Sequence, residues 1–102
     1  MMEMTEELIL AELEVGRVYN YFNHYNILII DRETANRYRA IGRASDIDGV
    51  FIKTVENPFF VKGTNIVKFP SESLQRYYYK QDSGRNFVMY QYYSKKLAEV
   101  GL

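Results

Sequence analysis

The sequence predicts an α+β fold. We expect a small curved antiparallel sheet, or a partly open SH3-like or OB-like barrel, with a short N-terminal helix and C-terminal helical segments. The chain has 102 residues, which suits one domain with one core. Short runs of aromatic and β-branched residues, separated by turn signals, fill residues 16–69. Their short connections favour antiparallel neighbours.

Composition narrows the class of protein. The whole chain, 1–102, is predicted to be a single domain with a helix over 4–14, a β-rich core over 16–69 and a mainly helical segment over 71–100. It contains no cysteine, so it has no disulfide framework and no thiolate metal site. Its longest apolar run is far too short to span a bilayer, and the N-terminus lacks a signal-peptide pattern. We expect a cytoplasmic protein with no membrane partner.

A β-hairpin over Gly16 to Asp31 is the strongest local signal. Arg17 to Phe22 and Tyr25 to Ile30 are rich in residues that favour strands. Asn23 and His24 lie between them, and asparagine tolerates the backbone conformation of a two-residue turn. This turn would place Phe22 opposite Tyr25.

The two faces of this hairpin are both apolar. Since side chains alternate along a strand, one face is predicted to be core and carries Val18, Phe22, Tyr25, Ile27 and Ile29. The other face carries Arg17, Tyr19, Tyr21, Leu28 and Ile30. The second face is too apolar to be fully exposed to solvent. Either another part of the chain or a partner covers it, and a homodimer through this face is one alternative.

The N-terminal segment has the pattern of an amphipathic helix. Thr5 is a suitable N-cap. Ile9, Leu10 and Leu13 share one face, and acidic residues occupy the opposite one.

Four more strands are predicted before residue 70. They are Arg37 to Arg43, Val50 to Val55, Phe59 to Lys62 and Ile66 to Phe69. In the first of them Arg37, Arg39 and Arg43 project from one face, which we expect to be wet. Asn57-Pro58 and Gly63 to Asn65 interrupt the series.

The last third admits two interpretations. Helical spacing of apolar residues favours helices over 71–80 and 88–99. The alternative is a second hairpin, in which Tyr77 to Tyr79 pair with Phe87 to Tyr93, because tyrosine favours strands.

No catalytic, cofactor or metal motif emerges. His24 is the one histidine, and a hairpin turn rarely positions the partners that catalysis or metal binding requires. Asp46-x-Asp48-Gly49 resembles the start of a calcium loop, but Ile52 and Lys53 stand where later ligands are needed. The scattered glycines form no phosphate-binding loop. The sequence therefore predicts a non-enzymatic protein with no cofactor.

Charge is unevenly distributed along a chain of zero net charge. Residues 1–16 hold five acids and no Lys or Arg, whereas Arg76 to Lys96 combines five bases with many tyrosines. Tyrosine and arginine anchor protein interfaces, and cations beside aromatic rings also bind single-stranded nucleic acid. We expect a protein-binding module, an adaptor or an inhibitor that covers a partner protein's surface; the alternative is a single-stranded RNA or DNA binder. The predicted contact residues are Tyr19, Tyr21, Arg37, Arg39, Arg76, Tyr78, Lys80, Arg85 and Tyr92.

Overall fold

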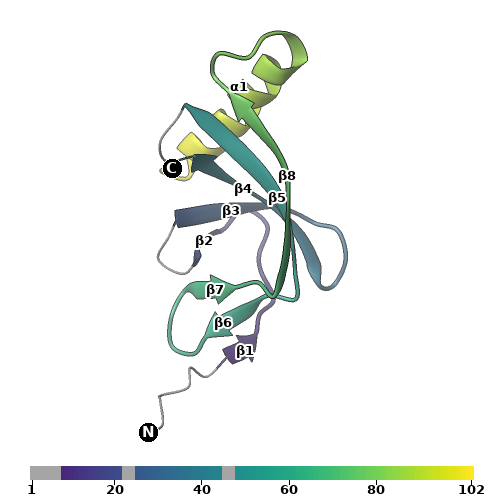
Figure 1. Ribbon diagram of the computed structural model, residues 1–102. Helices are drawn as coiled ribbons and strands as arrows, with labels where there is room; N and C mark the ends of the chain where they lie inside the picture. Colours follow the sequence, from purple (N-terminus) through teal and green to yellow (C-terminus); the bar gives the residue numbers. More distant parts are fainter. Residues whose placement is uncertain (1–7, 22–24, 45–47) are drawn as a thin grey trace, which may run out of the picture.

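The computed structural model describes residues 8–21, 25–44 and 48–102. In these residues eight strands form one sheet and a single helix follows them (Figure 1). The elements are β1 (Leu8–Leu10), β2 (Val18–Tyr21), β3 (Tyr25–Arg32), β4 (Arg37–Ala44), β5 (Gly49–Glu56), β6 (Phe59–Val61), β7 (Ile66–Lys68), β8 (Ser71–Tyr79) and α1 (Gly84–Glu99).

The sheet is mixed and has two edges. Its strand order is β1-β6-β7-β2-β3-β4-β5-β8. The neighbouring strands are antiparallel except β2 and β7, which run parallel. The short strand β1 forms one edge and the long strand β8 forms the other.

One face of the sheet is strongly concave. The Tyr21 hydroxyl on β2 donates a hydrogen bond to the Glu72 carboxylate on β8, although β3, β4 and β5 separate these strands. Side chains of distant strands meet in this way only on the inside of a curved sheet, so we name this side the concave face. Its core contains Ala11, Leu13, Tyr19, Ile27, Ile29, Tyr38, Ala40, Phe51, Val55, Val67 and Phe69.

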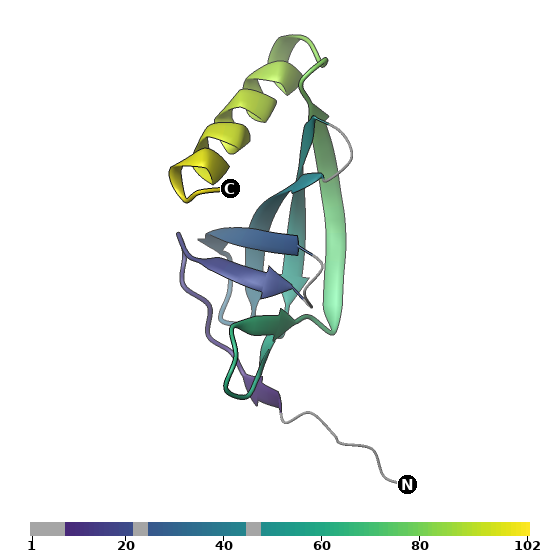
Figure 2. The same ribbon diagram turned by 90° about the vertical axis from the view of Figure 1, so that its left-hand side faces the viewer.

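Helix α1 covers the opposite side, which we name the helix face (Figure 2). Met89, Tyr93 and Leu97 recur every four residues and form the apolar stripe that packs on the sheet. The buried core there contains Leu28, Ile41, Val50, Ile52, Tyr93 and Leu97. No helix in the described ranges is long and apolar enough to cross a membrane.

Gly42 on β4 leaves room for an aromatic ring on β5. A Cβ atom at Gly42 would lie 2.4 Å from Cζ of Phe51. Any side chain there would displace the Phe51 ring, so glycine at this position allows the ring to lie close to the β4 backbone.

The predicted N-terminal helix is wrong for its described part, because residues 8–10 form β1. Leu8, Ile9 and Leu10 pair with β6, at Val61, Phe60 and Phe59 respectively. After β1, Ala11 and Leu13 are buried while Glu12 and Glu14 are exposed, a period of two instead of 3.6. Residues 4–7 of the predicted helix, with Thr5, lie outside the described residues.

The predicted small antiparallel sheet or SH3-like or OB-like barrel is also wrong. The described strands form an open mixed sheet, and β1 and β8 do not meet. The short connections favour antiparallel neighbours, because none of them is long enough to join two consecutive parallel strands. Strands β2 and β7 are not consecutive, since β3 to β6 supply the return path between them.

The hairpin is confirmed as the antiparallel pair β2–β3, but its register differs by one residue. Tyr21 lies opposite Tyr25, and Tyr19 opposite Ile27. A one-residue change moves every side chain of one strand to the other face. Tyr19 is therefore in the concave core and Val18 packs on the helix face. Phe22 and the predicted turn Asn23-His24 lie outside the described residues, as does Asp46.

The second apolar face of the hairpin is covered within the chain. Leu28 and Ile30 pack on the helix face against the cluster that contains Leu97. In the last third, the helix predicted over 88–99 is confirmed within α1, whereas the one over 71–80 is wrong. Residues Tyr77 to Tyr79 are strand, but they pair with β5 and not with Phe87 to Tyr93.

Candidate functional site

Aromatic rings form a continuous row across the concave face. The rings of Tyr21 and Tyr25 are stacked with centroids 5.1 Å apart, and those of Tyr25 and Phe51 form a T-shaped pair with centroids 5.4 Å apart. Phe51 contacts Tyr77 at 6.3 Å. We name as the aromatic row the rings that follow one another from the residue after β7 to the edge strand β8: Phe69, Tyr21, Tyr25, Phe51, Tyr77 and Tyr79.

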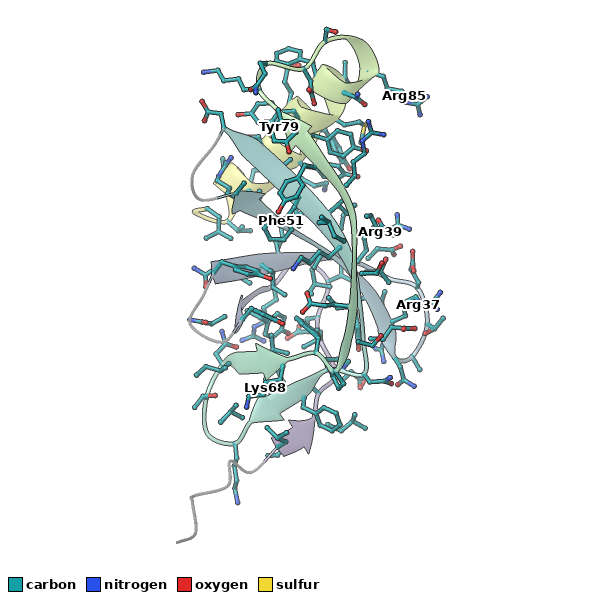
Figure 3. All side chains as sticks on the ribbon, in the orientation of Figure 1. Arg37, Arg39, Phe51, Lys68, Tyr79 and Arg85 are labelled. Atoms are coloured by element: carbon teal, nitrogen blue, oxygen red, sulfur yellow. The ribbon has the colours of Figure 1, made fainter. Side chains whose placement is uncertain are left out.

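The exposed end of the aromatic row lies on β8. Phe51 is 5% exposed, whereas Tyr77 is 39% exposed and the neighbouring Leu74 is 48% exposed. Figure 3 shows the labelled Phe51 and Tyr79 on the same side of β8. Apolar side-chain area is therefore exposed to solvent along the edge strand β8.

Lys53 lies at the centre of the aromatic row. Its ammonium is 5.3 Å from the ring centroids of Tyr25 and Phe51 and 5.8 Å from that of Tyr21. It donates hydrogen bonds to the Tyr25 hydroxyl at 2.8 Å and to the Glu72 carboxylate at 2.9 Å. Tyr21 donates to the same carboxylate. The cation is thus neutralised by Glu72 and enclosed by rings.

The cluster shifts the pKa values of its members. Burial alone would raise the pKa of Glu72, but hydrogen bonds from Tyr21 and Lys53 outweigh it and hold the pKa below the usual value. Burial alone would lower the pKa of Lys53, but its bonds to Tyr25 and Glu72 raise the pKa above the usual value. Burial and the bond to Glu72 raise the pKa of Tyr21 well above its usual value.

These pKa shifts predict that the protein is most stable near neutral pH and loses stability both in acid and in alkali. We call these two regions the acid limb and the alkaline limb of the pH profile. The contribution of Glu72 is present above its unfolded pKa, near 4.5, and is lost as pH falls through the lower folded value. The contributions of Tyr21 and Lys53 are present below their unfolded pKa values of 10.0 and 10.5 and are lost as pH rises. We expect Glu72→Gln to flatten the acid limb in melting temperatures measured across pH. The exposed Glu99→Gln is the control, and an unchanged acid limb in Glu72→Gln would contradict the assignment.

The predicted contact residues do not form one surface. Tyr19 is 3% exposed, and its hydroxyl accepts a hydrogen bond from the Glu14 backbone N–H at 2.9 Å. Tyr21 belongs to the aromatic row and is half-buried. These two tyrosines therefore lie on the concave face, away from the other predicted residues.

The arginines of β4 lie on the helix face and have acidic or backbone partners. Arg37 pairs with Glu56 at 2.9 Å, and Arg39 pairs with Glu33. Arg43 donates to the Ser94 hydroxyl and carbonyl, at 2.9 and 3.1 Å, and to the Leu102 carbonyl. The solvent-exposed basic face expected for this strand is therefore not found: acids neutralise Arg37 and Arg39, and hydrogen bonds to the C-terminal segment hold Arg43.

The structure brings together the remaining predicted residues near β8 and α1. The Arg76 guanidinium lies 5.2 Å from the ring of Tyr78, which packs below α1 beside Tyr93. Lys80 follows β8 and Arg85 lies in the first turn of α1, and both are exposed. Tyr92 is 52% exposed on α1 with the Lys96 ammonium 5.1 Å from its ring. Within the described ranges Arg76, Lys80 and Arg85 have no ion pair.

The sequence reasoning missed most residues of the concave surface, including Phe51, Lys53, Glu72, Leu74 and Tyr77. The alternation of β5 was a usable signal, because Phe51, Lys53 and Val55 fall on one face of a strand that was predicted correctly. The prediction of a helix over 71–80 concealed Glu72 and Tyr77, since helical spacing would not place them beside β5.

Two hollows in the described part of the chain are small. One of about 150 Å³ lies between α1 and β3, and one of about 200 Å³ lies beside Arg43. Both fall below the roughly 300 Å³ at which small-molecule sites begin. Among the same residues no three His, Asp or Glu side chains are grouped to hold a metal ion.

Comparison with known proteins adds no functional assignment. Neither the protein-family models, nor the curated proteins, nor the solved structures that we searched match this chain. The candidate site is therefore the surface formed by β8 and the aromatic row, and it is defined by geometry alone.

Proposed function

We propose that this protein is a non-enzymatic protein-binding module, an adaptor or an inhibitor that covers the surface of a partner protein. The observation that carries this proposal is the exposed apolar area of Leu74 and Tyr77 at the end of the aromatic row. Tyrosine supplies a large contact area at low entropic cost. Rigid packing of the row against Phe51 orients Tyr77 before a partner arrives, which lowers the cost of association.

Single-stranded nucleic acid binding is the alternative, and the placement of charge gives it less support. Stacked bases would need unpaired cations beside the rings to hold the phosphates. Lys53, at the centre of the row, is already neutralised by Glu72. Labelled arginines Arg37, Arg39 and Arg85 lie on the other side of β8 from Phe51 and Tyr79 (Figure 3).

The test compares two charge insertions. The double variant Leu74→Lys, Tyr77→Lys introduces cations into the proposed surface, and Val88→Lys introduces one at a side chain that is 57% exposed on α1. We expect wild type and Val88→Lys to retain a stoichiometric, nuclease-resistant protein partner. The double variant should weaken binding at least tenfold, because central interface positions carry most of the binding energy.

Two results would contradict the proposal. One is equal retention of the partner by the double variant, provided that its melting temperature shows it is folded. The other is tight binding of a single-stranded oligonucleotide with a steep salt dependence, which would support the alternative.

A further inference from the structure

Strand β8 exposes backbone hydrogen-bonding groups at the edge of the sheet. The Lys80 N–H donates to the Asp48 carbonyl at 2.9 Å, so the backbone of Lys80 points toward β5. At Tyr79 the N–H donates to the Asp82 carboxylate and the carbonyl accepts from the Asp82 N–H, so that backbone points away from β5. Since these directions alternate in an antiparallel pair, the N–H and C=O of Tyr77 also point outward.

Outward-pointing backbone groups also occur on the N-terminal side of a bulge in β8. Ile52 pairs with Arg76 and Lys53 with Leu74, which leaves Gln75 as an extra residue. Hydrogen-bonded and non-hydrogen-bonded residue pairs alternate between β5 and β8. By this alternation, the N–H and C=O groups of Leu74 and Glu72 point away from β5. No strand pairs with this edge in the described part of the chain. Asp82 supplies hydrogen-bond partners for the backbone N–H and C=O of Tyr79. The part of the edge that can still pair with another strand, which we name the open edge, therefore runs from Glu72 to Tyr77.

The two sides of this open edge differ in chemistry. Leu74 and Tyr77 lie on the concave face, because they pair with Lys53 and Phe51 of the aromatic row. Arg76 pairs with Ile52 and lies on the helix face, where it has no acidic partner within the described ranges. The rings of the aromatic row and the guanidinium of Arg76 are therefore on opposite sides of one strand.

Only a ligand whose successive groups point to opposite sides can use both surfaces at once. An extended polypeptide has this property, because its side chains alternate between the two faces of a sheet. We infer that β8 binds an extended segment of a partner protein as an added strand, and that this segment alternates apolar with acidic side chains. The inference rests on the protein-binding function proposed above and specifies its mode.

Charge complementarity decides the chemistry of the segment. The apolar side chains of the segment cover Leu74 and Tyr77. Its acidic side chains lie close to Arg76 and to Lys80, the residue that follows β8. The acid on β8 itself does not oppose this arrangement, because Glu72 is neutralised by Lys53. Backbone pairing supplies affinity, and the side chains on each face supply selectivity.

The experiment uses the full chain with a nine-residue peptide of alternating valine and glutamate, fused after Leu102 through a flexible glycine-serine linker. Tethering raises the effective concentration to about 1 mM, so weak pairing is detected. The measurement is amide hydrogen exchange by NMR. We expect exchange at Leu74 and Tyr77 to slow at least tenfold, with Ser73 and Arg76 unchanged because their N–H groups already face β5.

Three matched variants test the chemistry. A peptide with lysine in place of glutamate should reduce the protection about fivefold to tenfold, since unlike charges across strands become like charges. A peptide with prolines that remove its pairing N–H groups should give no protection. Arg76→Glu should reverse the preference between the two charged peptides, whereas Lys95→Glu, a matched change at an exposed position on α1, should not.

Several outcomes overturn the inference. Absence of protection at Leu74 and Tyr77 excludes strand addition, and equal protection by the lysine peptide excludes the acidic preference. Protection that appears without any tether and rises with protein concentration, together with a dimer in light scattering, would make a second copy the occupant. If strand addition fails while Leu74→Lys, Tyr77→Lys still loses the partner, the binding function stands with a different mode. If both fail, the binding function falls too.

Discussion

Replacing Tyr38 by alanine is expected to destabilise the protein by about 3–5 kcal/mol, the usual cost of removing a buried aromatic ring. Tyr38 is 0% exposed and lies in the middle of the concave core. Its hydroxyl accepts a hydrogen bond from the Leu13 backbone N–H at 3.2 Å, and the Arg32 guanidinium lies 5.3 Å from its ring. Loss of the ring therefore leaves a cavity and an unsatisfied N–H, and it removes the ring contact of Arg32, which keeps its ion pair with Glu12.

Urea unfolding of three variants separates these effects. Tyr38→Phe keeps the ring and loses the hydroxyl, so it should cost about 1–3 kcal/mol through the unsatisfied Leu13 N–H. Tyr92→Ala removes a ring that is 52% exposed and serves as the control. A cost below about 1 kcal/mol for Tyr38→Ala would show that this residue does not support the concave core.

Replacing Leu97 by alanine is expected to cost about 2–5 kcal/mol and to loosen α1 from the sheet. Leu97 is 0% exposed and packs with Tyr93 on the helix face. Few other buried side chains hold α1, so a cavity at Leu97 weakens a large share of the contact. The helical signal in circular dichroism should then decrease at a lower temperature than in the wild type.

The same helix provides the control for this prediction. Val88 is 57% exposed on α1, and Val88→Ala should change stability by less than about 0.5 kcal/mol. If Leu97→Ala and Val88→Ala unfold at the same urea concentration, the packing of α1 on the sheet does not stabilise the protein.

Local patterns in the sequence predicted the hairpin, the strands β4 to β7 and the helix over 88–99. These elements carry their own turn signals or a clear period. The hairpin register was harder, because both faces of β2 and β3 are apolar and both are buried within the chain. When neither face is polar, alternation cannot decide which residues face each other.

The edges of the sheet were the least predictable elements. Leu8 to Leu10 fit a helix as well as a strand, and pairing with β6 decides between them. Leu74, Tyr77 and Tyr78 fit a helical face, but pairing with β5 makes the segment a strand. The candidate site inherits this difficulty, since its position on β8 depends on a partner strand that local spacing does not reveal.

The parallel pair β2–β7 has a consequence for synthesis of the chain. Tyr21 emerges from the ribosome well before Val67, the residue that lies opposite it. At about 5–20 residues per second, the intervening stretch takes roughly 2 to 10 s to translate. During that interval the nascent β2 can pair with β3 on one side only, and its other side stays available to chaperones or to neighbouring nascent chains.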